Sequence, residues 1–126
     1  MREVHLDTNV LIGVAKHSVP EDTRVRSWLG QRVSVRTSTV AWAEFLCGPL
    51  PADAGPSVRV VVGDPIQLTA DDASRAAELF NATGRRRGSL NDCMIAAFAM
   101  RAGAELATND ASHFRQFVAL GLKIAD

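Results

Sequence analysis

Four acidic residues are the candidates for chemistry in this chain of 126 residues, because each stands in its own short motif among apolar neighbours. They are Asp7, Glu44, Asp92 and Asp110. Two carboxylates about 4 Å apart repel each other by roughly 4 kcal/mol at an effective dielectric near 20, so a fold that gathers several of them needs a compensating cation. Ligand sets made of oxygen alone select a hard cation such as Mg²⁺ or Mn²⁺. The four acids therefore predict metal-assisted chemistry on phosphate.

Each acid also has a purely structural interpretation. Asp7 and Asp110 could simply cap the helices that follow them, and Asp92 could be the partner of Ser89 in a capping box. Glu44 has no such role, because its neighbours one helical turn away are apolar or small. A carboxylate in that position is costly unless it is paired with an arginine or ligates a cation. The structural interpretation needs a separate coincidence for each acid, whereas one shared site accounts for all of them.

Short strands and amphipathic helices alternate along the chain and would position these acids. Strands are predicted at residues 4–6, 33–37, 66–68, 105–107 and 122–124. Helices are predicted over residues 8–16, 21–29, 38–47, 69–80, 89–100 and 110–117. This alternation predicts an α/β fold with a central, mostly parallel sheet flanked by helices on both faces. Asp7 and Asp110 directly follow strands, at the carboxyl edge of the sheet where ligands bind in such folds, and Asp92 lies in the first turn of a helix.

The segment from residue 50 to 63 is ambiguous on sequence grounds. Its valines favour a strand, but a short helix is also compatible with them. Residues 84–88 contain three consecutive arginines between glycines and are expected to form a loop. The arginines Arg85, Arg86 and Arg87 would lie near the acids and grip RNA phosphates, or would be a solvated loop or a surface for the acidic groups of a partner.

Composition is consistent with one globular domain over residues 1–126. Apolar residues make up 47% of the chain, and 14 basic residues balance 14 acidic ones, which does not exclude a nucleic-acid ligand. We see no hydrophobic leader and no apolar stretch long enough to span a membrane, so a cytoplasmic protein is expected. Cys47 and Cys93 lie in apolar helical patterns and are interpreted as reduced core thiols.

Other residues near the acids are candidates for supporting roles. Thr8, Asn9 and Asn109 adjoin the proposed ligands and could orient carboxylates as a second layer of contacts, although all three are also ordinary capping residues. His5 and His113 lack the partners of a nucleophile–base pair, so they are interpreted as structural, and no Ser-His-Asp or Cys-His arrangement is present. A receiver-like module and a haloacid dehalogenase-type phosphatase are disfavoured, because the required lysine and the second acid of an Asp-x-Asp loop are missing.

The four motifs together resemble those of a known family. They are Leu6-Asp7-Thr8-Asn9-Val10-Leu11-Ile12, then Thr37 to Phe45, then Ser89 to Ala99, and finally Leu106 to Phe114. In this order and spacing they resemble the PIN domain over almost the whole chain, and at this length they are most similar to VapC toxins of type II toxin–antitoxin pairs. Asn91 departs from the resemblance, since the family often has proline before the third acid. We expect this difference to affect the start of the helix more than the chemistry.

The resemblance implies a function as well as a fold. It implies a metal-dependent endoribonuclease in which the catalytic and metal-binding residues are Asp7, Glu44, Asp92 and Asp110, with Mg²⁺ or Mn²⁺ activating a water to leave 5′-phosphate and 3′-hydroxyl ends. It also implies a homodimer, a helix in residues 50–63 and a groove for a VapB-like antitoxin. Trp28, Trp42 and Phe45 are by default core residues of their helices, but some of them, with Leu46 and Leu50, could line that groove. The alternative is a PIN-fold module that binds RNA or protein without catalysis.

Overall fold

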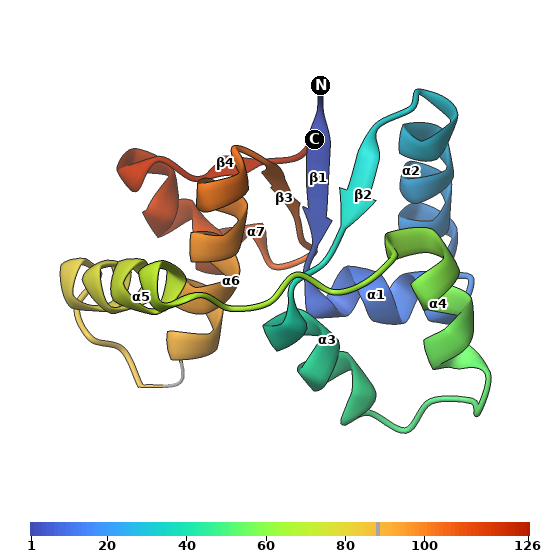
Figure 1. The fold of residues 1–126 in the computed structure, drawn as a ribbon, viewed down its shortest axis with the longest axis horizontal. Coiled ribbons are helices and arrows are strands. Elements are labelled where there is room, and N and C mark those ends of the chain that lie inside the picture. The colour runs from blue at the N-terminus through green and yellow to red at the C-terminus, as the bar shows by residue number, and fades with distance from the viewer. Residues whose placement is uncertain (88) are drawn as a thin grey trace.

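The computed structural model describes residues 1–87 and 89–126 and has a parallel sheet at its centre (Figure 1). Within these residues the sheet has four strands in the order β2-β1-β3-β4, and every pair is parallel. The strands are β1 (Glu3–Leu6), β2 (Ser34–Arg36), β3 (Glu105–Ala107) and β4 (Lys123–Ile124). Strand β1 is central, with Val4 opposite Val35 of β2 on one side and Glu105 of β3 on the other. The predicted parallel sheet is confirmed.

Helices cover the sheet on both sides, as the alternating pattern predicted. Figure 1 shows α2 and α4 beside β2, and α5 and α6 on the opposite side of the β1–β2 pair. The helices are α1 (Thr8–Ala15), α2 (Val19–Gly30), α3 (Thr39–Leu46), α4 (Ala54–Val62), α5 (Ala70–Ala82), α6 (Leu90–Ala102) and α7 (Ala111–Phe114), followed by a 3₁₀ helix, η1 (Arg115–Leu120). The predicted helix over residues 110–117 is therefore divided into α7 and the beginning of η1.

The core lies between the sheet and these helices. Val4 and Leu6 of β1, Leu106 of β3 and Phe45 of α3 are fully buried. The middle of α6 is buried, and its buried residues include the small side chains of Ala96 and Ala97. Small side chains allow a helix to approach its neighbours closely, and Asp92 in the first turn of α6 lies at the pocket beside the carboxyl edge of the sheet.

Two segments differ from their local propensity. The predicted strand at residues 66–68 is wrong, since Ile66 forms only an isolated bridge with Ser38 while Gln67 and Leu68 are exposed and add no pairing. The valine-rich segment is the helix α4, as the family resemblance implied and against its strand propensity. Val58 and Val62 are buried one turn apart on the same face of α4, and this burial outweighs the weak intrinsic preference of valine.

The start of α6 corrects a capping prediction. Ser89 precedes the helix but has an αR backbone, and within the described residues its side chain makes no capping hydrogen bond; its hydroxyl donates to the Arg86 carbonyl at 2.7 Å. The proposed capping box between Ser89 and Asp92 is therefore wrong. A capping box does form at the start of α5, between Thr69 and Asp72. Gly88, part of the predicted loop at residues 84–88, lies outside the described residues.

The cysteines and aromatic residues are distributed unevenly between core and surface. Cys93 is a buried thiol as expected, but Cys47 is exposed, because it lies at the end of α3 where the chain turns outward. Trp28 is buried, with the guanidinium groups of Arg2 and Arg24 over its ring at 5.9 and 5.0 Å from the centroid. Within the part of the chain that the structure describes, no helix has the length and apolarity that crossing a membrane requires.

Candidate active site

The candidate site lies at the carboxyl edge of the sheet, where β1 and β3 end side by side. Strand β1 leads through α1 to β2 on one side, and β3 leads through α7 to β4 on the other. Connections that leave neighbouring strands in opposite directions open a crevice between them, which is the usual ligand site of an open parallel sheet. Asp7 follows β1 directly, and residues 108–110 follow β3.

All four acids selected from the sequence line one pocket of about 240 Å³ at this crevice. The pocket is lined by Asp7, Thr8, Asn9, Ile12, Glu44, Asp92 and Asp110. They come from the end of β1, from α1 and α3, from the first turn of α6 and from the residue before α7. Among the described residues, four acids and no basic side chain line this pocket.

Asp7 is both a helix cap and a pocket residue. One of its carboxylate oxygens, Oδ1, accepts from the backbone N–H of Thr8 at 2.7 Å, and the other, Oδ2, accepts from the hydroxyl of Thr108 at 2.8 Å. Asp7 is only 6% exposed, and burial raises its pKa despite these hydrogen bonds, with Glu44 and Asp110 adding repulsion. The capping role therefore coexists with the candidate role.

Glu44 is held by neutral donors. The hydroxyl of Thr8 donates to Oε1 at 3.1 Å, and the side-chain amide of Asn91 lies 3.3 Å from Oε2. None of the four acids forms an ion pair with Lys, Arg or His among the described residues. Asn91, which was expected to affect the start of the helix more than the chemistry, thus also contacts a candidate acid through its side chain.

Asp110 is linked to the two asparagines selected from the sequence. The side-chain amide of Asn9 donates to Asp110 Oδ2 at 3.0 Å, and the backbone N–H of Asn109 donates to Asn9 Oδ1 at 3.1 Å. Thr8 and Asn9 therefore contact candidate acids directly, whereas Asn109 contacts Asp110 through Asn9. The side chain of Asp110 makes no capping hydrogen bond to α7, so capping does not explain it in the described chain.

Asp92 differs from the other acids because no described donor holds its carboxylate. Burial raises its pKa from 3.8 to about 6, repulsion from Asp7, Glu44 and Asp110 adds to this, and the charge of His113 opposes it. A pKa raised by burial and by like charges is typical of functional sites.

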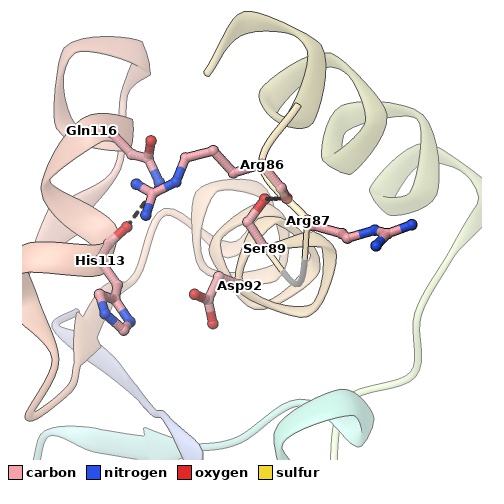
Figure 2. Close-up of a pocket in the computed structure, with 6 residues that line it drawn as sticks. All are labelled: Arg86, Arg87, Ser89, Asp92, His113 and Gln116. Carbon is pink, nitrogen blue, oxygen red and sulfur yellow. Dashed lines mark hydrogen bonds between the residues drawn. The ribbon is translucent and has the colours of Figure 1, made fainter. Parts of the chain in front are cut away.

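A second, smaller pocket of about 130 Å³ shares Asp92 with the acidic pocket and carries positive groups. It is lined by Arg86, Arg87, Ser89, Asp92, His113 and Gln116. In Figure 2 Arg86 extends toward Gln116 and His113, whereas Arg87 extends in the opposite direction. Arg85 is absent from this lining, and its guanidinium donates to Asn81 of α5 at 2.9 Å. Arg86 and Arg87 therefore line a pocket that also contains Asp92, but the Arg87 side chain extends away from that acid.

The histidines occupy different surroundings. His113 lies beside Asp92 in the smaller pocket, whereas His5 is buried in β1 with its Nε2 atom 2.6 Å from Glu3 Oε2. Burial lowers the pKa of His5 although Glu3 opposes this. Among the described residues, His5 and His113 make no hydrogen bond with a serine or cysteine side chain.

Three residues join the site that sequence reasoning did not select. Thr108 bonds Asp7 and also accepts from the backbone N–H of Asp110 at 3.0 Å. Asn91 approaches Glu44, and Glu21 at the start of α2 accepts from the side chain of Asn109 at 2.8 Å. Thr108 could have been found by its place in the fourth motif. Glu21 carries no local signal, because it is 88 residues from its partner.

The donor chemistry of the acidic pocket fits a hard divalent cation. Four carboxylates meet there with raised pKa values at Asp7 and Asp92 and without a basic partner, which a Mg²⁺ or Mn²⁺ ion would relieve. Their spacing is wider than that of a closed metal cage, since no three acid, histidine or cysteine side chains of residues 1–87 and 89–126 are grouped closely enough to hold one ion. The residues fit the cation by the chemistry of their oxygen ligands and by their charge, although the described carboxylates are not grouped as a closed cage.

An apolar groove of about 460 Å³ lies away from these pockets, between α1, α2 and α4. Its apolar lining includes Val14, Val25, Leu29, Val58 and Val61, and its rim carries His17, Asp22, Arg26 and Asp53. None of the five residues proposed from the sequence for an antitoxin groove lines it. Trp28 and Phe45 are buried in the core, which is the default expectation for aromatic residues at helical spacing.

Several solved structures share this fold at low sequence identity. VapBC2 from Rickettsia felis bound to a promoter DNA fragment matches with a TM-score of 0.76 and 21% identity, over 98% of this chain and 99% of that one. A toxin–antitoxin complex from Klebsiella pneumoniae matches with a TM-score of 0.71 and 22% identity, over 88% of this chain and 89% of that one. VapBC-1 from nontypeable Haemophilus influenzae matches with a TM-score of 0.71 and 20% identity, over 98% of this chain and 97% of that one.

At the level of sequence, no curated protein matches this chain. The family model described as the PIN domain matches residues 4–119, which is nearly the whole chain. The fold and the order of the four acidic motifs agree with this match. The protein belongs to the PIN domain family.

Proposed function

We propose that this protein is a metal-dependent endoribonuclease and the toxin of a toxin–antitoxin pair. The observation that carries the proposal is the acidic pocket, in which Asp7, Glu44, Asp92 and Asp110 converge from separate segments without a basic partner in the lining. Membership of the PIN family and likeness to solved toxin–antitoxin complexes support the same function.

The proposed mechanism assigns the four acids to a Mg²⁺ or Mn²⁺ site. The bound ion would lower the pKa of a water and neutralise charge on the phosphate, so that hydrolysis leaves 5′-phosphate and 3′-hydroxyl ends. The chain's own contribution is orientation. Thr108 holds Asp7, Thr8 and Asn91 hold the two oxygens of Glu44, and Asn9 holds Asp110.

The same proposal places the RNA backbone across the smaller pocket. Arg86, Arg87 and His113 line this pocket together with Asp92. Arg86 and His113 would bind a phosphate next to the scissile one, and Arg87, which extends away from them in Figure 2, would contact the strand farther along. Arg85 is engaged with Asn81 and is not part of this proposed surface. A single strand that entered between the two pockets would meet positive groups on one side of Asp92 and the acids on the other.

The proposed protein partner is a VapB-like antitoxin. The structural neighbours include complexes of toxin with antitoxin, and the groove between α1, α2 and α4 is apolar with charged residues on its rim. These features suit an amphipathic segment of an antitoxin. A homodimer, expected from the resemblance, stays a prediction that sedimentation velocity would test.

The first experiment is RNA cleavage by the purified protein with Mg²⁺ or Mn²⁺, in parallel with EDTA and an Asp92→Asn variant. We expect cleavage that both controls abolish, with 5′-phosphate ends detected by a 5′-phosphate-dependent exonuclease. Cleavage that leaves a cyclic 2′,3′-phosphate would contradict the mechanism, because a metal-assisted water attack does not use the neighbouring 2′-hydroxyl.

The alternative is a PIN-fold module that binds without catalysis, and the wide spacing of the acids among the described residues favours it. Isothermal titration with Mn²⁺ separates the two functions. Binding that Asp92→Asn weakens supports the nuclease. An empty site at millimolar Mn²⁺, together with intact RNA, would support the binding module.

A further inference from the structure

A fifth carboxylate is linked to the candidate site from outside the four motifs. Glu21, in the first turn of α2, accepts through Oε1 from the side-chain amide of Asn109 at 2.8 Å. The backbone N–H of Asn109 donates to Asn9 at 3.1 Å, and the side-chain amide of Asn9 donates to Asp110 at 3.0 Å. Three consecutive hydrogen bonds therefore connect α2 to one of the four acids.

A glycine in α1 leaves space for the Glu21 side chain, although glycine lowers the stability of the helix. Gly13 is buried within α1, and a Cβ atom there would lie 2.5 Å from Cγ and 2.7 Å from Cδ of Glu21. Glycine inside a helix is less stable than alanine by roughly 1 kcal/mol, so a helix retains it where another group must approach closely. The close approach at Gly13 is that of the Glu21 side chain.

Glu21 is also directed inward, unlike the acid next to it. Asp22 pairs with Arg26 on the same helix at 2.8 Å, as acids on a solvent-facing helix commonly do. The Oε2 atom of Glu21 is buried and has no partner within the described residues, and Glu21 forms no ion pair there. A charged acceptor bonds an amide more strongly than a neutral one, which favours a fixed orientation of Asn109.

We propose that Glu21 is a positioning residue that fixes Asn109 and, through Asn9, the carboxylate of Asp110. It touches neither substrate nor metal and acts only through these two asparagines. Its effect on RNA cleavage rests on the proposed nuclease function, whereas its effect on the orientation of Asn109 and Asn9 does not. These two consequences are measured separately.

The first test compares Glu21→Ala with Glu21→Gln by kinetics and metal binding. Loss of the acceptor in Glu21→Ala is expected to lower kcat about tenfold and to weaken Mn²⁺ binding by a similar factor, with the KM for RNA nearly unchanged. Glu21→Gln keeps an oxygen that can accept from Asn109 and should restore most of kcat. Asp71→Asn, an exposed acid in the first turn of α5, serves as the control for loss of a helix-terminal charge. Equal activity and Mn²⁺ affinity in Glu21→Ala and the wild type would overturn the proposal.

A double-mutant cycle tests whether Glu21 acts through Asn109. If it does, Glu21→Ala combined with Asn109→Ala should lose no more kcat than the more impaired single variant, because both remove the same connection. Multiplied losses in the double variant would show independent action and would overturn the proposal. Thermal unfolding of all variants identifies any that are not folded at the assay temperature.

A nuclear magnetic resonance measurement separates this proposal from the proposed function. Side-chain amide resonances of Asn109 and Asn9 are recorded without metal or RNA in the wild type, Glu21→Ala and Gly13→Ala. We expect both resonances to shift in both variants, since Gly13→Ala displaces Glu21 without removing it. If no RNA is cleaved and no Mn²⁺ binds but these shifts occur, the nuclease function fails and the positioning link stands. Unshifted Asn9 in folded Glu21→Ala would overturn the link.

Discussion

At the level of single residues, the four candidate acids are stabilised unequally. Asp7 accepts two hydrogen bonds, Glu44 is approached by two donors, and Asp110 accepts one from Asn9. Asp92 has no described donor, and its pKa is raised to about 6 by burial and by the other acids. The pKa values of Asp7 and Asp92 are both raised, but Asp92 has no described donor to offset this, so its charge should affect both stability and metal binding.

Asp92→Asn should make the metal-free protein more stable at pH 7.5. Because the folded pKa of about 6 lies above the ordinary value of 3.8, the stability contributed by protonated Asp92 is complete below 3.8 and is lost as pH rises through 6. Asparagine imitates the neutral acid at every pH. Allowing for solvent screening at this half-buried position, we expect a gain of about 1 kcal/mol, or about 3 °C in Tm.

Thermal unfolding followed by circular dichroism in EDTA measures this difference. The two proteins should have similar Tm values below about pH 4, where Asp92 is neutral in both folded and unfolded chains. A wild type as stable as the variant at pH 7.5 would show that Asp92 is not repelled by its neighbours.

The affinity for Mn²⁺ should fall as the pH is lowered, because protons compete with the ion for Asp92. With a metal-free pKa of about 6, the ionised fraction drops about tenfold between pH 7 and pH 5, and the affinity should drop by a similar factor. Isothermal titration at several pH values measures it. The Asp92→Asn variant should bind weakly and with a shallower dependence on pH, and a wild-type affinity that is constant over this range would contradict the assignment.

At the level of elements, the candidate site is built from the ends of strands and the starts of helices. The ends of β1 and β3 supply Asp7 and Asp110, and the first turn of α6 supplies Asp92. The loop before α6 brings Arg86 and Arg87 to the same place, while Arg85 turns back to α5. Only part of the basic run is therefore available beside the acids, and this division can be tested.

Replacing Arg86 and Arg87 together with alanine should weaken RNA binding and reduce its dependence on salt. Each contact with a phosphate of single-stranded RNA contributes about 0.7 to the slope of log affinity against log salt, so loss of two contacts should lower that slope by about 1.4. Fluorescence anisotropy across a salt series measures it. Arg75→Ala, an exposed arginine of α5 that pairs with Glu78, is the control. An unchanged slope in the double variant would exclude phosphate contacts at the smaller pocket.

At the level of the whole molecule, folding is what creates the acidic pocket that we propose as the metal site. The four acids belong to segments that are far apart in the chain, and only the packed sheet and helices place them around one pocket. An unfolded chain has no such arrangement and should bind a divalent cation weakly. A ligand that binds only the folded state stabilises it by mass action.

Mn²⁺ should therefore raise the Tm of the protein. At ten times the dissociation constant the gain is about 1.4 kcal/mol, or roughly 4 °C for a domain of this size. Differential scanning calorimetry measures the gain, which excess EDTA should reverse and Asp7→Asn should largely remove. A Tm that does not respond to millimolar Mn²⁺ would contradict a metal site formed by these acids.

Local sequence patterns determined much of the secondary structure, because strands, helices and helix caps depend largely on residues that are close together in the chain. Strand β1, the capped helix α5 and the α/β alternation follow from short apolar runs and from Thr69, and the four acids were recognisable by their motifs. The segment over residues 50–63 was ambiguous, because propensity favoured a strand while the buried face of α4 requires a helix. The strand predicted at residues 66–68 was wrong because a strand needs a partner elsewhere in the chain, and this segment forms only the isolated bridge between Ile66 and Ser38.

The tertiary structure alone decided which side chains meet around the acids. Asn91 contacts Glu44, which is 47 residues away in the sequence, and Glu21 accepts a hydrogen bond from Asn109, which is 88 residues away. The failed cap at Ser89 leaves Asp92 in the pocket, and the apolar groove forms from three helices rather than from the aromatic residues that attracted notice in the sequence. Hydrogen bonds and burial act over a few ångströms of space whatever the distance along the chain, so contacts between distant residues leave no local pattern to be read.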